Sequence, residues 1–170
     1  YNGVKSSREV TFECEVKKPE IETITILEAR SAAMGEKVTI EGYVIGFLYL
    51  KGAQTPAGFE LIDETSSIAV FVSTEVDAKT DITKIKKGEY VIVEGYGDLY
   101  QPRTDYDHKG SIRLNNAEVL YQDWLEHEIN PDWIEEMSMA DLVNNPSNNN
   151  ISNKVYKTVI PRNVRLSEAP

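Results

Sequence analysis

The chain has 170 residues, 41% of them hydrophobic and 27% charged, a composition that suits one ordinary globular domain with flanking segments. It contains no run of about 18 apolar residues, so no stretch of this sequence is predicted to insert in a membrane. The formal net charge is -10, which excludes a general attraction to phosphate backbones and means that any nucleic-acid site needs a local basic patch.

Residues 1–22 are predicted to be an N-terminal strand segment and linker. They begin at Tyr1 without an initiator methionine or a signal-peptide pattern, which favours a fragment or a processed product. A "YNG" turn precedes an apolar alternation that includes Cys14, the single cysteine, which we interpret as a small strand residue rather than a reactive thiol. The stretch resembles the closing hairpin of a bacterial immunoglobulin-like surface module, and this resemblance implies an exported, multidomain parent protein.

Residues 23–122 are predicted to form the main domain, which opens with a short helix. Apolar residues recur at helical spacing after Thr25. Thr25 is a candidate N-cap, Glu28 is its capping-box partner three residues later, and Gly35 ends the pattern.

A long strand over residues 37–50 follows the helix. It alternates and then becomes continuously apolar, and Gly42 and Gly46 permit it to bend. Polar turns separate it from the later strands. These are predicted over residues 59–65, 66–74, 90–101 and 111–122, with a short helix or loop over 75–89 crossing the barrel.

Five strands in this order, the first long and bent, with a connector between the third and fourth, are typical of the oligonucleotide/oligosaccharide-binding (OB) fold. The stretches "KVTIEGYVIGF", "GFELIDETSSIAVFV", "IKKGEYVIVEGYGDLYQ" and "IRLNNAEVL" resemble bacterial OB domains related to anticodon-binding barrels and to barrels that precede nuclease domains in secreted proteins. The resemblance covers about residues 24–121. The predicted fold class is therefore all-β, a five-stranded OB-fold barrel with short flanking helices.

The composition changes in residues 123–150, which carry acidic residues and no lysine or arginine. We expect an acidic helical segment, broken at Pro131, that packs on the barrel, followed by an Asn-rich linker. Residues 151–170 are predicted to be strand-like, and their stretch "KVYKTVIPRNVRLSEAP" resembles the late strand and following loop of ParA-type partition ATPases. No G-x-x-x-x-G-K-[ST] loop occurs, so no nucleotide-binding residue is assigned. Residues 151–170 are therefore either a short appended segment or the start of a second module, and both interpretations stay open.

No convergent catalytic set is found in the sequence. His108 and His127 lack metal-ligand spacing to another histidine or to the cysteine. Asp63 and Glu64 lie in a predicted turn, where acidic residues are favoured for structural reasons, and "DYDH" at residues 105–108 is typical of a solvated loop. We therefore predict no enzyme activity, no cofactor and no metal.

Ligands of this barrel lie across the second and third strands, between the first–second and fourth–fifth loops. Aromatic rings there offer a flat face to a base or sugar, and Lys or Arg offers charge to phosphates or hydroxyls. The alternative for strand aromatics is core or cross-strand packing. The predicted ligand-binding residues are Tyr49, Lys51, Phe59, Phe71, Tyr100, Arg103, Tyr106 and Lys109.

These patterns predict a noncatalytic binding module of an exported bacterial protein, secreted or at the cell surface, that contacts single-stranded nucleic acid or an oligosaccharide. A cytoplasmic location is the alternative. Two other functions are open: a structural or protein-interaction module that uses the acidic flank, and an accessory domain of a larger secreted nuclease or phosphatase.

Overall fold

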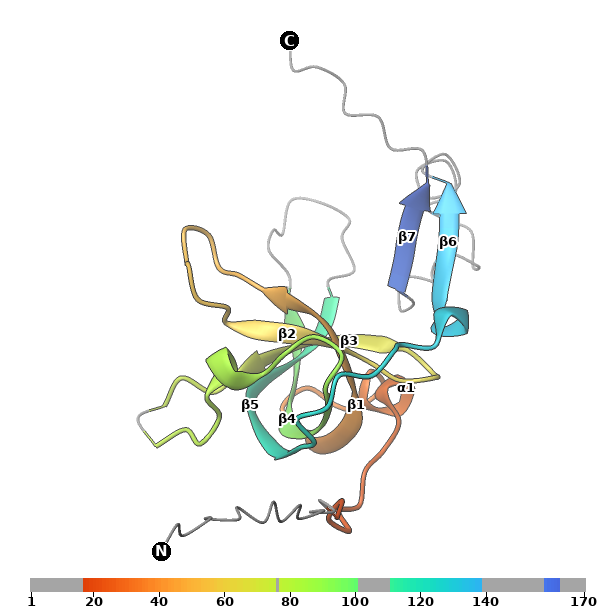
Figure 1. Cartoon of the computed structure of the whole chain (residues 1–170). Coiled ribbons are helices and arrows are strands. Elements are labelled where there is room, and N and C mark those ends of the chain that lie inside the picture. Colours follow the sequence, from red (N-terminus) through yellow and green to blue (C-terminus); the bar gives the residue numbers. More distant parts are fainter. Residues whose placement is uncertain (1–16, 76, 101–110, 139–157, 163–170) are drawn as a thin grey trace, which may run out of the picture.

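The computed structural model describes residues 17–75, 77–100, 111–138 and 158–162, and β-strand is their main regular structure (Figure 1). The strands are β1 (Lys37–Leu48), β2 (Gly58–Ile62), β3 (Ser67–Val72), β4 (Tyr90–Tyr100), β5 (Ser111–Gln122), β6 (Ile134–Ser138) and β7 (Thr158–Arg162). The helical pieces are α1 (Ile26–Ala29) and the 3-10 helices η1 (Ile82–Lys84) and η2 (Pro131–Trp133). Among these described residues, no helix has the length and apolar character that crossing a bilayer requires.

Strands β1 to β5 close into a barrel in the order β1-β2-β3-β5-β4. The neighbours in it are antiparallel except β3 and β5, which run parallel. This order, in which a long first strand pairs with both the second and the fourth, is the topology of the OB-fold. The predicted fold class is therefore confirmed.

Strand β1 pairs with two neighbouring strands, β2 and β4, because it bends. Its residues Lys37–Tyr43 pair with β4, its residues Tyr43–Leu48 pair with β2, and the register shifts just before Gly46. At Gly42 a Cβ would overlap the carbonyl oxygen of Ile62, whereas no atom lies within 4 Å of the Cβ position at Gly46. The predicted bend is present, and the close approach of two backbones requires glycine at Gly42 but not at Gly46.

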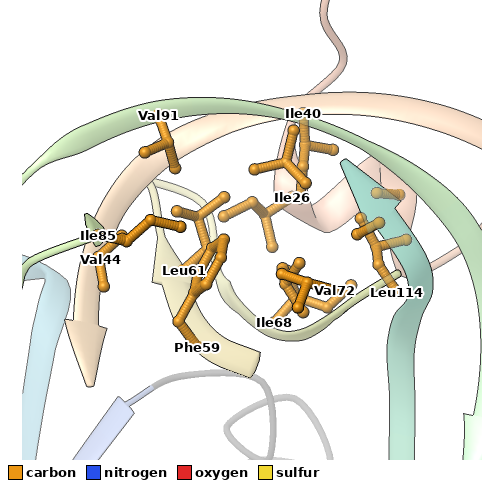
Figure 2. Close-up of a cluster of buried hydrophobic side chains, with 14 of the residues drawn as sticks. Ile26, Ile40, Val44, Phe59, Leu61, Ile68, Val72, Ile85, Val91 and Leu114 are labelled. Atoms are coloured by element: carbon orange, nitrogen blue, oxygen red, sulfur yellow. The ribbon is translucent and has the colours of Figure 1, made fainter. Parts of the chain in front are cut away.

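The inward-facing residues of the strands meet inside the barrel and form its core (Figure 2). Phe59 is the largest of the fully buried side chains. Ile26 from α1 belongs to the same cluster, as do Ile82 and Ile85 from the connector between β3 and β4. Since burying one such aliphatic side chain contributes about 1.5–3 kcal/mol, these contacts fix both α1 and the connector against the barrel.

Helix α1 begins as the sequence predicts but ends early. The Thr25 hydroxyl accepts from the Glu28 peptide NH (3.2 Å), and the Glu28 carboxylate accepts from the Thr25 peptide NH (2.8 Å), so the predicted capping box is present. The helix ends at Ala29, one turn on, whereas the sequence pattern placed its end at Gly35. The peptide NH of Gly35 donates instead to Gly97 in β4 (2.8 Å), and this contact binds the chain to the barrel.

The Asp63 carboxylate joins α1 to the turn between β2 and β3. Its Oδ2 accepts from the peptide NH of Ile26 (2.8 Å), and its Oδ1 accepts from the peptide NH groups of Thr65 (2.7 Å) and Ser66 (2.8 Å). One side chain thus satisfies three backbone donors from two segments. This explains structurally why an acidic residue stands in the turn.

Replacing Asp63 with alanine is expected to lower the free energy of unfolding by about 2–3 kcal/mol, because three partly buried NH groups lose their acceptor. Urea denaturation followed by circular dichroism measures the loss. Asp81→Ala is the control, since Asp81 caps only the exposed η1 turn and its loss is expected to cost about 1 kcal/mol or less. Equal losses in the two variants would show that the link from Asp63 to α1 contributes nothing.

The described part of the segment after β5, residues 123–138, contains no α-helix, so the prediction of an acidic helical segment is wrong there. Residues 123–130 have no regular structure, residues 131–133 form one 3-10 turn, and residues 134–138 are β6. The peptide NH of His127 donates to the Gly88 carbonyl (3.0 Å), which holds the segment in extended form against the loop before β4. β6 then pairs in parallel with β7, so non-local pairing overrides the local helical pattern.

Strands β6 and β7 form a separate two-stranded sheet beside the barrel (Figure 1). β7 falls within residues 151–170, which the sequence predicts to be strand-like. Residues 1–16 and 139–157 lie outside the described residues, so the predicted N-terminal hairpin and the whole Asn-rich linker, residues 144–150, lie outside them too. The resemblances to an immunoglobulin-like module and to ParA-type ATPases stay predictions.

Candidate functional site

The loop between β1 and β2, residues 49–57, carries the first predicted ligand residues (orange in Figure 1). The Leu50 carbonyl accepts a backbone hydrogen bond of 2.9 Å from three residues on, and Gly52 has a φ of 81°, so the chain turns tightly. This turn leaves Tyr49 56% exposed, Leu50 60% exposed and Lys51 exposed as well. The loop therefore presents an aromatic ring, an aliphatic side chain and an ammonium group to a ligand.

Phe71 lies on the outer face of β3, close to the base of this loop. Leu48 at the end of β1 pairs with Gly58, and Gly58 pairs with Phe71, so two strand spacings of about 5 Å separate the ring from the loop. The guanidinium of Arg113 on β5 lies 4.9 Å from the Phe71 ring centroid. Its Nε donates to Asp98 Oδ2 on β4 at 2.7 Å, which fixes the guanidinium over the ring.

Tyr49, Lys51, Phe71, Asp98 and Arg113 together are named the outer binding face below. It contains two aromatic rings, two cations and one carboxylate, from the β1–β2 loop and strands β3, β4 and β5. Three of these residues, Tyr49, Lys51 and Phe71, are among those that the sequence predicts. The face can stack a planar group on a ring and can donate hydrogen bonds to phosphate or hydroxyl oxygens.

Phe59 does not belong to the outer binding face, and its prediction as a ligand residue is wrong. Its side chain is fully buried in the barrel together with Leu61, while Glu60 between them faces outward. Successive side chains of a strand point to opposite faces, so the outward carboxylate forces both neighbours into the core. The alternation of apolar and polar residues in "GFELI" already indicates that Phe59 faces the core.

The remaining predicted ligand residues belong to the end of β4 and the loop after it. Tyr100 is the last residue of β4 and pairs with Ser111 at the start of β5, and the structure does not describe its side chain. Arg103, Tyr106 and Lys109 lie in residues 101–110, outside the described residues. Their assignment to the site stays a prediction.

Sequence reasoning missed Arg113 and Asp98. In "SIRLN" the apolar Ile112 and Leu114 alternate with Arg113, so an outward arginine was readable from the pattern. Its contact with Phe71 was not readable, because it depends on the parallel register in which Ala69 pairs with Arg113. Parallel pairing of strands distant in sequence leaves no local signal.

Away from this face, a hollow of about 320 Å³ lies between the η1 connector and the end of β5. Lys79, Lys84, Tyr121 and Trp124 line it. The Lys84 ammonium pairs with Asp81 at 3.3 Å, so part of its charge is already compensated. Trp124 is 58% exposed. This basic hollow is a competing location for an anionic ligand.

No protein-family model matches this sequence, and no curated protein matches it. Two solved structures match this chain, both at low sequence identity. The hypothetical protein ygiW from E. coli matches with a TM-score of 0.38 and 15% identity, over 65% of this chain and 97% of that chain. Entamoeba histolytica asparaginyl-tRNA synthetase in complex with asparaginyl-adenylate matches with a TM-score of 0.39 and 13% identity, over 81% of this chain and 28% of that chain.

Proposed function

We propose that this chain is a noncatalytic OB-fold binding module of an exported bacterial protein and that it contacts single-stranded nucleic acid through the outer binding face. The observation that carries the proposal is the Arg113 guanidinium over Phe71, beside a loop that exposes Tyr49 and Lys51. Export is supported only by the sequence resemblances given above, and fractionation of cells that express the parent protein tests it.

The face supplies what single-strand binding requires. Unpaired bases expose flat surfaces, and stacking of one base on an aromatic ring contributes about 1–3 kcal/mol. Tyr49 is 56% exposed on the β1–β2 loop, whereas Phe71 lies on a strand and is covered by the Arg113 guanidinium. One exposed ring on the loop and one ring on β3, with backbones about 10 Å apart, suit the stacking of two bases of a single strand.

The charge of the chain limits how this binding works. With a net charge of -10, phosphate attraction is confined to the cations of the face, and Asp98 compensates part of the Arg113 charge. The affinity for a single strand falls with salt with a slope of about -0.7 for each phosphate neutralised. We therefore expect stacking to supply most of the affinity and the salt slope to be only about -1 to -2.

Fluorescence anisotropy with labelled single-stranded DNA and RNA, at low and at physiological salt, tests the proposal. We expect a dissociation constant of about 1–100 μM at low salt. Tyr49→Ala and Lys51→Ala are each expected to weaken binding about 3- to 30-fold. Lys84→Ala and Trp124→Ala, which change only the basic hollow, are the matched controls and are expected to leave the affinity unchanged.

Three other outcomes contradict the proposal in different ways. Loss of binding in Lys84→Ala and Trp124→Ala alone would move the site to the basic hollow. If no anisotropy change occurs with DNA or RNA at either salt concentration, and a labelled oligosaccharide binds and loses affinity in Tyr49→Ala, the ligand of the outer binding face would be a glycan and not a nucleic acid. If neither the nucleic acids nor the oligosaccharide change the anisotropy, the outer binding face does not have the proposed role.

A further inference from the structure

A pocket of about 270 Å³ lies on another part of the barrel, where β1 and the start of β4 meet η2. Three aromatic side chains from these elements line it: Tyr43, Tyr90 and Trp133. The ring centroid of Tyr43 lies 5.3 Å from that of Tyr90, in an edge-to-face arrangement, and 5.9 Å from that of Trp133. Tyr43 therefore joins the other two rings into one aromatic wall.

Carboxylates complete the lining of this pocket. Asp63, Glu41 and Glu64 all contribute to it. Asp63 is engaged by backbone NH groups, but Glu64 is exposed and has no hydrogen bond or ion pair with a described residue. Aromatic faces beside an unpaired carboxylate, here that of Glu64, attract cations and repel anions.

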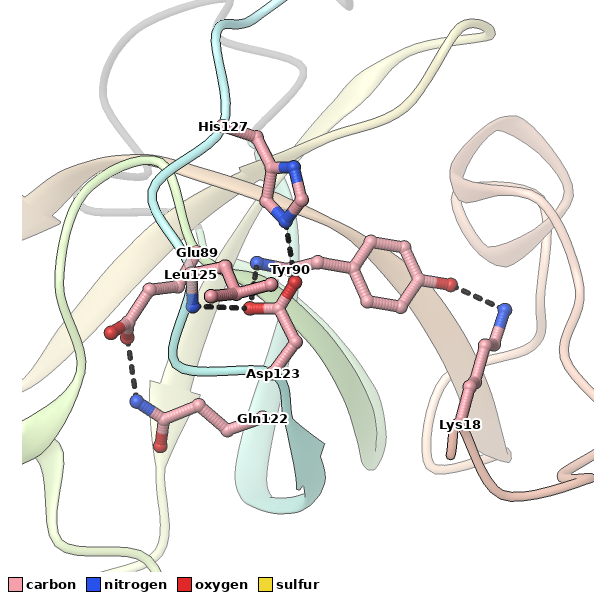
Figure 3. Close-up of polar contacts among 7 residues, drawn as sticks. All are labelled: Lys18, Glu89, Tyr90, Gln122, Asp123, Leu125 and His127. Carbon is pink, nitrogen blue, oxygen red and sulfur yellow. Dashed lines mark hydrogen bonds and ion pairs between the residues drawn. The ribbon is translucent and has the colours of Figure 1, made fainter. Parts of the chain in front are cut away.

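A cation of the chain itself already lies at the edge of the pocket. The ammonium of Lys18 donates to Glu41 Oε2 at 2.8 Å and lies 4.9 Å from the Tyr90 ring centroid. It also donates to the Tyr90 hydroxyl at 2.6 Å (Figure 3). These two hydrogen bonds raise the pKa of Lys18 above its usual value. Burial of the ring raises the pKa of Tyr90 to about 12, so the Tyr90 hydroxyl stays protonated at neutral pH.

Polar contacts of Asp123 fix the backbone of Tyr90 and the residues that pack beside the aromatic wall. Asp123 Oδ1 accepts from the peptide NH groups of Tyr90 and Leu125, both at 3.1 Å, and Asp123 Oδ2 lies 2.5 Å from His127 Nε2 (Figure 3). The His127 ring in turn packs edge-on against Tyr43, with ring centroids 5.3 Å apart. The pocket is thus preformed by the fold, which lowers the entropic cost of binding a ligand.

We propose that this pocket is a binding site for primary alkylammonium groups and that Lys18 is an intramolecular competitor at its edge. The contacts of Lys18 show how such a group would be bound. One ammonium group contacts a carboxylate, a tyrosine hydroxyl and the face of an aromatic ring. Glu64 and the faces of Tyr43 and Trp133 are available for a second group or an aliphatic stem. The ligand is a diamine or the lysine side chain of a peptide, which share this chemistry.

The site differs from the outer binding face in location and in charge. Its residues come from the segment just before α1, from β1, the β2–β3 turn, β4 and η2, and none of them belongs to the outer binding face. It recognises a cation, whereas the outer binding face is proposed to recognise an anionic strand. Either proposal can fail while the other stands.

Tryptophan fluorescence provides the test, because the sequence contains two tryptophans and a Trp124→Phe background leaves Trp133 at the pocket as the reporter. The probes are 1,5-diaminopentane and a capped tripeptide Gly-Lys-Gly, titrated at pH 7. We expect saturable changes with a dissociation constant of about 1 mM or tighter. Lys18→Ala is expected to tighten binding about two- to fivefold, because it removes the competing ammonium.

Further variants separate the site from general attraction to an acidic protein. In the Lys18→Ala background, Glu64→Gln and Tyr90→Phe are each expected to weaken binding about two- to fivefold. Glu75→Gln, a change in an exposed carboxylate outside this pocket, is the matched control and is expected to change nothing. Tetramethylammonium, which cannot donate a hydrogen bond, is expected to bind more weakly than the primary amine.

Two results would overturn the assignment. One is the absence of a saturable response to both probes in the Lys18→Ala protein, with circular dichroism showing that the protein is folded. The other is equal weakening by Glu75→Gln and Glu64→Gln, which would reduce the effect to nonspecific charge. If the site is real, the probe that binds more tightly tells whether a free diamine or a peptide lysine is the better ligand.

Discussion

Replacing Phe59 with alanine is expected to lower the free energy of unfolding by about 3–5 kcal/mol. Phe59 is the largest fully buried side chain, and its neighbours in the core cluster come from every strand of the barrel. A closed barrel cannot collapse easily around a lost ring, so a cavity term adds to the lost burial. Urea denaturation measures the change as a lower midpoint at constant slope.

Phe71→Ala is the control for this prediction, since both phenylalanines lie on the neighbouring strands β2 and β3. Phe71 is only partly buried on the outer face, and its removal is expected to cost about 1 kcal/mol of stability. It is also expected to weaken single-strand binding, by about 5- to 100-fold. A larger loss of stability in Phe71→Ala than in Phe59→Ala would contradict the assignment of the two rings to opposite faces.

Replacing Gly42 with alanine is expected to lower the free energy of unfolding by about 3 kcal/mol. The new methyl group would overlap the carbonyl oxygen of Ile62 and lie 3.1 Å from its carbonyl carbon. Neither backbone can shift freely, because Gly42 pairs with Val91 and Ile62 pairs with Tyr43. Thermal unfolding followed by circular dichroism measures the loss as a lower Tm.

Gly46→Ala in the same strand is the matched control. No atom lies within 4 Å of the position that its Cβ would take, so the change is expected to alter the free energy of unfolding by no more than about 0.5 kcal/mol. A similar loss of stability in both variants would mean that β1 needs glycine for flexibility rather than for the close approach to β2. A neutral Gly42→Ala would contradict the register of the two strands.

The elements of the barrel could be predicted from the sequence because their signals are local. Period-two alternation locates the strands, the Thr25 and Glu28 side chains mark the start of α1, and an acidic turn residue marks the reversal at Asp63. The order of strands and connector was then enough to select the OB-fold. The exposure of Tyr49 and Lys51 was predictable because a loop rich in glycine and small residues exposes its side chains.

The face of Phe71 was harder to predict than that of Phe59. β2 contains the polar Glu60, which sets the phase of its alternation and places Phe59 inside. β3 is nearly continuously apolar, so periodicity alone cannot tell which of its residues face outward. Only the pairing of β3 with β2 and β5 decides that Phe71 faces outward and meets Arg113.

The sequence by itself determined the number and order of the barrel strands, the cap of α1 and the exposure of Tyr49 and Lys51 in the β1–β2 loop. The tertiary structure alone decided the contact of Arg113 with Phe71, the approach of Lys18 to Tyr90 across 72 residues, and the extended form of residues 134–138, which local periodicity favours as helix. The physical reason is the range of the interactions. Alternation and capping act within a few residues, whereas strand register and ring contacts depend on backbone hydrogen bonds between segments distant in sequence.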